Sequence, residues 1–185
     1  MNMNPFEQAW ALLKMPIVPG SLQHTGTDDG IDEYEAQFEH PVTGEIYPMR
    51  GDVHDREANT FIFNPGTEPG HENMRQWTGS THGPIGDSNF SPRTDEAEDA
   101  KTWEGRPYIA ERDFAYRDSE GNMPNLDGDE APPVGMGSAL YDLAARMAHE
   151  RAGAKIVPSP NRSTPAMNMW AKHEDKGHWP VRDDL

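Results

Sequence analysis

The first half of the chain alternates apolar and polar residues over short stretches, which is the pattern of β-strands. Tyr34, Ala36 and Phe38 alternate with acidic residues and predict a strand with one buried face. The Pro- and Gly-containing stretch 40–45 predicts a turn, so residues 33–54 are expected to form a β-hairpin.

Around this hairpin the pattern is less regular. Two short apolar stretches predict further strands at 59–64 and 106–118. Residues 21–32 are polar and rich in Gly and Asp, so we interpret them as a linker. From 65 to 102 the chain is mostly Gly, Pro, Asn and acidic residues, which predicts a long irregular connection whose scattered aromatic residues pack in part.

The most regular part of the sequence lies near its C-terminal end. Apolar residues recur there with the spacing of one helix face and predict a core-facing helix over 138–152. The face consists of Leu140, Leu143, Ala144, Met147 and Ala148. Ser138 lies where a cap is expected and Gly153 where a helix ends. A buried strand at 154–157 and a short helix within 163–173 are expected to follow.

Residues 4–15 predict a further short helix at the start of the chain. Asn4 can cap it, and Phe6, Trp10 and Leu13 share one face. A helix of this length is unstable alone in water, so it docks either on its own domain or in the groove of a protein partner.

Composition and charge narrow the classes of function. The 185 residues carry 32 acidic and 16 basic side chains, a formal net charge of −16, which disfavours nucleic-acid binding through phosphate neutralisation. The absence of cysteine excludes disulfides and thiolate chemistry. No apolar stretch approaches the length of a membrane span, and the N-terminus lacks the pattern of a signal peptide. We therefore expect a cytoplasmic protein, in a host cytoplasm or a virion if phage-encoded, with no membrane association.

Two glycines, Gly135 and Gly137, lie immediately before the predicted C-terminal helix. Glycine lets backbone N–H groups approach a ligand closely, and a helix N-terminus carries partial positive charge. The stretch could therefore cradle a phosphate, or it could be an ordinary loop that leads into a helix.

The same residues carry a resemblance to a known family. The cofactor loop of the GNAT superfamily of N-acyltransferases reads Gln/Arg-x-x-Gly-x-Gly/Ala, opens a helix and is followed by a strand. "PPVGMG" supplies Gly135 and Gly137 at the matching positions, with Pro132 where the family has Gln or Arg. The stretch from there to "STPAMNMW" is similar to the helix, strand and next helix of the family. The resemblance covers residues 132–171 and extends to small phage-encoded members.

The resemblance implies an α+β fold with a mixed, largely antiparallel sheet flanked by helices. It implies one such domain at residues 31–185, preceded by an N-terminal helix and linker at residues 1–30. It also implies acetyl-CoA as cofactor and an amine-bearing small molecule or protein as acceptor. The cofactor would contact Val134, Gly135, Met136, Gly137 and Ser138.

Further site residues follow from the resemblance. Glu111 is the positional candidate for the base that takes the amine proton, or it is a solvated strand residue. Ser159 or Asn161 would contact the pantetheine arm, although a plain turn explains both as well. Tyr141 lies one turn into the helix, where a surface tyrosine is equally plausible. The C-terminal tail offers no tyrosine to protonate the leaving thiolate.

Other chemistry has weaker sequence support. Asp52, His54 and Asp55, and the pair His71 and His82, are possible nitrogen and oxygen ligands. None of them shows a recognised metal-binding spacing, so no metal site is expected. No GxSxG nucleophile motif is present.

Two functions therefore remain open. The first is an acyl-CoA-dependent N-acyltransferase, whose acidic surface would favour a cationic amine. The second is a non-catalytic interaction or structural protein of the same fold, which could be a phage component. It would bind its partner through the acidic surface and the aromatic face of residues 4–15.

Overall fold

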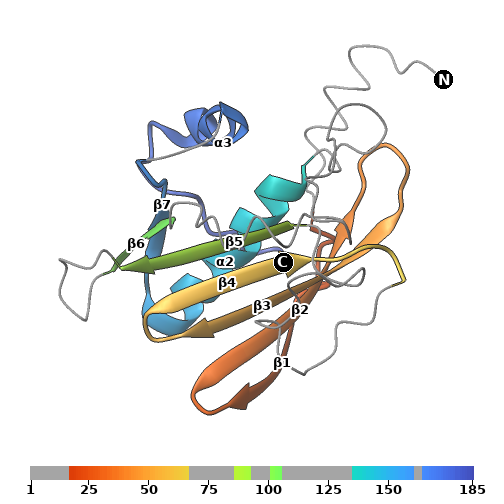
Figure 1. Cartoon of the computed structure of the whole chain (residues 1–185), viewed down its shortest axis with the longest axis horizontal. Coiled ribbons are helices and arrows are strands. Elements are labelled where there is room, and N and C mark those ends of the chain that lie inside the picture. The colour runs from red at the N-terminus through yellow and green to blue at the C-terminus, as the bar shows by residue number, and fades with distance from the viewer. Residues whose placement is uncertain (1–16, 67–85, 93–100, 106–134, 161–163) are drawn as a thin grey trace, which may run out of the picture.

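The computed structural model describes residues 17–66, 86–92, 101–105, 135–160 and 164–185. They form one seven-stranded sheet with two α-helices, an α+β architecture (Figure 1). The strands are β1 (Gln23–Asp28), β2 (Ile31–Glu39), β3 (Ile46–His54), β4 (Glu57–Ile62), β5 (Gly86–Pro92), β6 (Thr102–Gly105) and β7 (Lys155–Val157). The helices are α2 (Met136–Ala152) and α3 (Thr164–Trp170), and the 3-10 helix η3 (Ala171–His173) follows α3.

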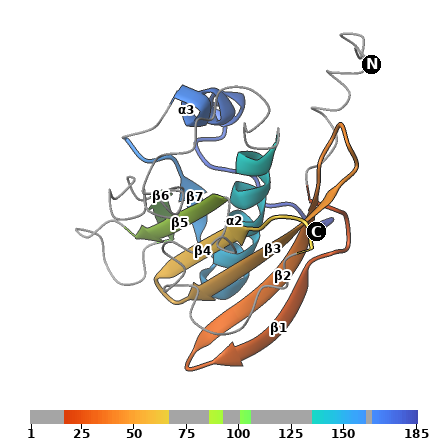
Figure 2. The same cartoon turned by 45° about the vertical axis from the view of Figure 1, so that its right-hand side comes forward.

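The sheet follows the chain order from β1 to β7. Every neighbouring pair is antiparallel except β6 and β7, which are parallel because α2 lies between them in the chain. The largely antiparallel mixed sheet expected from the sequence is thus observed. Figure 2 shows the resulting meander with α2 behind it.

The predicted hairpin is confirmed as β2 and β3, with Phe38 opposite Tyr47. His40 holds the turn between them, since its Nδ1 accepts the backbone N–H groups of Val42 and Thr43, both at 3.1 Å. The strand predicted at 59–64 is β4, shifted toward the N-terminus by two residues.

Two predictions about the connections are wrong. Residues 21–32 are not a linker, because 23–28 form β1, which pairs with β2. The irregular connection predicted for 65–102 contains strand β5, whose Phe90 is 2% exposed. Apolar alternation does not identify polar or glycine-rich strands. Such strands are held in the sheet by backbone hydrogen bonds to their neighbours and not by an apolar face of their own. The helix predicted at 4–15 and the strand at 106–118 lie outside the described residues.

The helix predicted at 138–152 is α2, and all five residues of its predicted apolar face are buried. Its end at Gly153 is also confirmed: Gly153 is left-handed, with φ 61°, and its N–H donates to the carbonyl of His149 at 2.8 Å. Ser138 is not the cap, since the helix begins two residues earlier, after Gly135. The predicted strand and terminal helix are β7 and α3.

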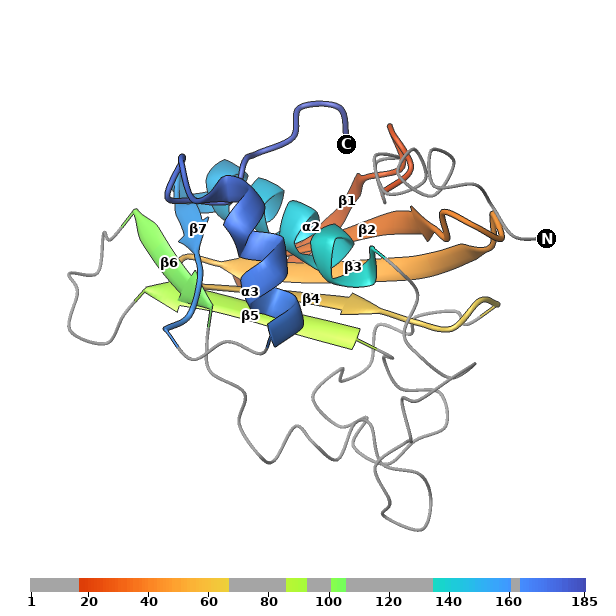
Figure 3. The ribbon, with the colours of Figure 1, turned by 90° about the horizontal axis from the view of Figure 1, so that it is seen from above.

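α2 packs across one face of the sheet, and the C-terminal residues lie on the same side (Figure 3). Side chains alternate along each strand, so the face under α2 holds the apolar core. Its fully buried members include Phe38, Val53, Ile62, Trp103 and Ile156.

Candidate functional site

The described part of the predicted phosphate loop, residues 135–138, forms the start of α2. Gly135 precedes the helix with φ 91°, a left-handed conformation that favours glycine. Among the described residues no side chain caps this end, and the first turn of α2 holds no acidic residue. The N–H groups of Met136, Gly137 and Ser138 therefore have no acceptor within the helix.

The start of α2 lies beside the end of β4 and the beginning of β5. The Met136 side chain packs there, so closely that a Cβ on Gly86 would lie 2.8 Å from Met136 Cε and 3.0 Å from Ile62 Cγ2. β6 and β7 run in the same direction as β4, but β6 ends at Gly105, which pairs with Phe90, four residues along β5 from Gly86. The helix N-terminus therefore lies beyond the ends of the parallel pair, on the side toward which these strands run.

Helix α3 packs directly on the same turn. A Cβ on Gly137 would lie 2.8 Å from Met169 Cε, and the Ser138 hydroxyl donates to Met169 Sδ at 3.6 Å. The close approach of α3 thus accounts for glycine at position 137. A ligand would have to reach the N–H groups from the side of Gly135, along the helix axis.

The structure brings together four of the five predicted cofactor residues, Gly135 to Ser138, while Val134 lies outside the described residues. Glu111 and Asn161 also lie outside them. Ser159 is 7% exposed and lies next to the end of β6, since a Cβ on Gly105 would be 3.5 Å from the backbone nitrogen of Ser159.

Tyr141 belongs to an aromatic cluster rather than to the surface. Its ring lies 5.5 Å from Phe90, 5.6 Å from Trp170 and 5.1 Å from Trp179, measured between centroids. The two tryptophans are almost fully buried. The cluster joins α2, β5 and the C-terminal residues, so the tyrosine serves packing.

The C-terminal residues are fixed to α2 by a buried carboxylate. Asp142 accepts the indole N–H of Trp179 at 2.8 Å and pairs with the Arg182 guanidinium at 3.1 Å. Burial raises the pKa of Asp142, against the opposing effect of the Trp179 and Arg182 hydrogen bonds. Further along, the Asp184 carbonyl accepts the Gly20 N–H at 3.2 Å, which ties this segment to the chain just before β1.

A second polar site, on the sheet face opposite α2, was missed by the sequence analysis. Asn59 Nδ2 donates to Asp52 Oδ1 at 2.8 Å, and Asn89 Nδ2 donates to both Asn59 Oδ1 and a carboxylate oxygen of Glu57. Glu57 in turn contacts His54 Nε2 at 3.3 Å. Asn59 and Asn89 are 7% and 6% exposed. These residues form a continuous hydrogen-bonded chain across β3, β4 and β5, which we call the amide chain.

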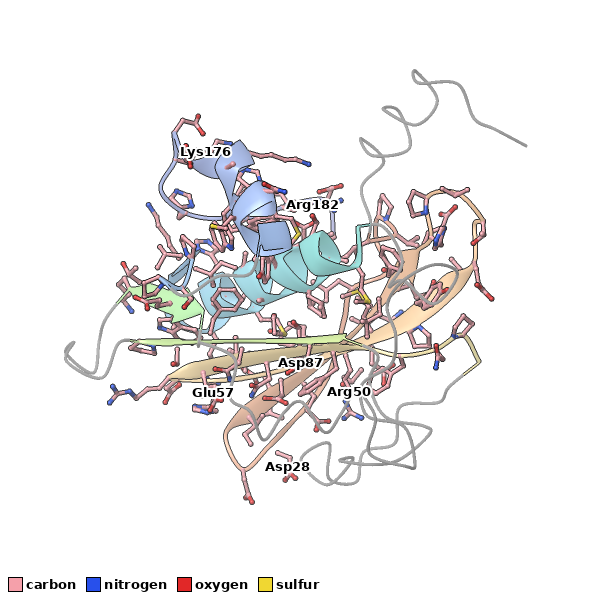
Figure 4. All side chains as sticks on the ribbon, turned by 45° about the horizontal axis from the view of Figure 1, so that its top comes forward. Asp28, Arg50, Glu57, Asp87, Lys176 and Arg182 are labelled. Atoms are coloured by element: carbon pink, nitrogen blue, oxygen red, sulfur yellow. The ribbon has the colours of Figure 1, made fainter. Side chains whose placement is uncertain are left out.

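A buried ion pair lies on the same face. Arg50 is 1% exposed, and its Nη2 lies 2.9 Å from Glu33 Oε2. Figure 4 shows Arg50, Glu57 and Asp87 on the side of the sheet away from α2, whereas Arg182 lies on the side of α2. The sequence indicates this polar face only through polar side chains at alternate positions of the strands, and that pattern also fits a solvated face.

Metal ligation is not supported in the described part of the chain. Its His, Asp and Glu side chains, including Asp52, His54 and Asp55, form no group of three that could hold a metal ion. His71 and His82 lie outside the described residues.

Comparison of the chain with protein-family models, curated proteins and solved structures finds no match. No helix in the described ranges combines the length and apolar character that crossing a membrane requires.

Proposed function

We propose that this chain is an acyl-CoA-dependent N-acyltransferase that uses acetyl-CoA and an amine acceptor. One observation carries the proposal. Helix α2 follows left-handed Gly135, which supplies no capping side chain, and has no acid in its first turn; it begins beyond the ends of β6 and β7, on the side toward which these parallel strands run. The strand–helix–parallel-strand order also agrees with the resemblance of residues 132–171.

The donors at this end fit a pyrophosphate. The N–H groups of Met136, Gly137 and Ser138 can donate to phosphate oxygens, and the helix dipole adds partial positive charge. Acetyl-CoA, when bound, supplies the acetyl thioester. Glu111 is the proposed base for the amine proton. The chain's acidic charge favours a cationic acceptor.

The test measures the melting temperature with and without acetyl-CoA for the wild type and two variants at position 138. Ser138→Asp adds a carboxylate to the third position of α2. It should stabilise the free protein by about 0.3–1 kcal/mol through the helix dipole, yet abolish the acetyl-CoA shift by repelling phosphate. Ser138→Asn is the neutral control and should keep the shift. An unshifted wild type at millimolar acetyl-CoA would contradict the proposal.

A second candidate is a non-catalytic interaction or structural protein, such as a phage component. The packing of Met169 on Gly137 supports it, because that contact explains the glycine without any ligand. This protein would show no acetyl-CoA shift. Deletion of residues 1–15, which keeps the fully buried Ile17 and its bridge to Phe38, would leave its fold intact and remove partner binding.

A further inference from the structure

The orientations of two amides on the polar face are fixed by their neighbours. The Asp52 carboxylate can only accept hydrogen bonds, so Asn59 must present Nδ2 to it at 2.8 Å and Oδ1 to β5. Asn89 must then present its own Nδ2 to Asn59 Oδ1, where Glu57 accepts from it as well. The amide chain therefore leaves no alternative flip for Asn89.

This orientation leaves Asn89 Oδ1 as a buried acceptor. No donor among the described residues reaches this oxygen, and Asn89 is 6% exposed. A buried acceptor without a donor is destabilising, because it has lost its hydrogen bonds to water and gained none in return. Both partners of Nδ2 belong to β4, so Oδ1 is the end of the amide that is turned away from them.

The charged side chains that β5 and β6 contribute to this face are acidic, while Arg50 of β3 lies two strands away from β5 and pairs with Glu33. Asp87 and Ser91 lie two positions to either side of Asn89 along β5, so they share its face of the sheet. Glu104 of β6 is the cross-strand partner of Ser91 and shares that face too. In Figure 4, Asp87 and Glu57 both lie on this side of the sheet. A ligand here would have to donate hydrogen bonds and carry positive charge.

We propose that this face of β5 and β6 binds a primary ammonium group, with Asn89 Oδ1 as the fixed acceptor and Asp87 and Glu104 as the opposing charges. A hard metal ion fits less well, since Ca²⁺ and Mg²⁺ require about six oxygen ligands and the described residues offer no group of three acidic or imidazole ligands. Only the identification of this amine as the acyl acceptor rests on the proposed function.

The experiment titrates the full chain with n-butylammonium chloride and follows the side-chain amide signals of Asn89 by ¹H–¹⁵N NMR. Tetramethylammonium is the matched probe, because it carries the same charge but no N–H donor. We expect n-butylammonium to shift the Asn89 signals and to bind at least about tenfold more tightly than tetramethylammonium, the ratio that one hydrogen bond to a charged donor supports. Equal binding of both cations, or no shift at Asn89, would overturn the proposal.

Variants separate the local charge from the overall charge of the protein. Asp87→Asn and Glu104→Gln should each weaken n-butylammonium binding about tenfold, whereas Asp28→Asn should leave it unchanged. Asp28 is exposed on β1 and its substitution makes the same change in net charge as either variant. The probe pair tests the wild type, so it decides the question even if a variant fails to fold. Equal weakening by Asp28→Asn would reduce the effect to general charge attraction and overturn the site.

A last arm repeats the titration with acetyl-CoA present. Amine binding without any acetyl-CoA binding would leave the site standing and remove only the acyl acceptor role. Acetyl-CoA binding without amine binding at Asn89 would leave the proposed function standing and remove the site.

Discussion

The two faces of the sheet are built from the same strands and are both buried in part, yet they are held by different forces. Under α2 the strands present Phe38, Val53 and Ile62, which pack against the apolar face of the helix. On the opposite face the described strands present the buried polar residues Arg50, Asn59, Asn89 and Ser91. Burial of the first set stabilises the fold directly through the hydrophobic effect.

Burial of the second set is favourable only where hydrogen bonds replace water. Such a face depends on complementary donors and acceptors, so a single exchange of an NH₂ group for an oxygen can destabilise it. The apolar face, by contrast, is sensitive to volume. The two faces are thus stabilised differently: one by apolar packing against α2, and the other by complementary hydrogen bonds, in which Asn89 Oδ1 lacks a donor among the described residues.

The largest expected effect comes from reversing one donor in the amide chain. Asn59→Asp replaces the amide that donates to Asp52 with a second carboxylate at a position that is 7% exposed. We expect a loss of about 3 kcal/mol in the free energy of unfolding at neutral pH, as for a buried charge that lacks its partner. Urea unfolding followed by circular dichroism measures the loss.

The double variant Asn59→Asp with Asp52→Asn is the matched control. It exchanges the donor and the acceptor, so most of the lost stability should return. A single variant as stable as the wild type, or a double variant no better than the single, would show that the two side chains are not hydrogen-bonded and would remove the basis for the orientation of Asn89.

The next effect tests the volume of the apolar interface. A Cβ on Gly51 of β3 would lie 2.3 Å from Sδ and 2.6 Å from Cε of Met147, a side chain of α2 that is fully buried. Gly51→Ala should therefore cost about 1–3 kcal/mol through overpacking. Gly26→Ala on the edge strand is the control, since no atom lies within 4 Å of its Cβ. It should be neutral or stabilising by up to about 1 kcal/mol. Equal effects of the two substitutions would mean that α2 does not approach β3 this closely.

The apolar side of this comparison could be predicted from the sequence, and most of the polar side could not. The spacing from Leu140 to Ala148 and the stop at Gly153 specify α2, because a helix face and its end have local signals. The alternation from Tyr34 to Phe38 specifies β2 in the same way. Strands β1 and β5 lack this alternation. They form because they pair with β2 and β4, and a local sequence pattern does not reveal such pairing.

The candidate sites divide similarly. The positions of Gly135 and Gly137 at the start of α2 could be predicted, because a glycine pair before a helix is contiguous in sequence. The contact of Met169 with Gly137 could not, since 32 positions separate residues 137 and 169. The amide chain spans three strands, and its hydrogen bonds follow from strand register, which no part of the sequence states.

The smallest expected effect concerns pH, on the α2 side of the sheet. His173 lies against Trp179, with the ring centroids 4.4 Å apart. Burial lowers the pKa of His173 below its usual value, and the nearby Lys176 lowers it further, although Asp142 and Asp175 oppose them. The unfolded chain then takes up a proton at this histidine at a higher pH than the folded chain does.

The contribution of His173 to stability is thus present above about pH 6.5, the usual histidine value, and is lost as the pH falls from there through the folded pKa. We expect the melting temperature of His173→Gln to fall less between pH 7 and pH 5 than that of the wild type. His149→Gln, at the exposed end of α2, should keep the loss of the wild type. A loss in His173→Gln as large as in the wild type would show that His173 does not contribute to the acid sensitivity.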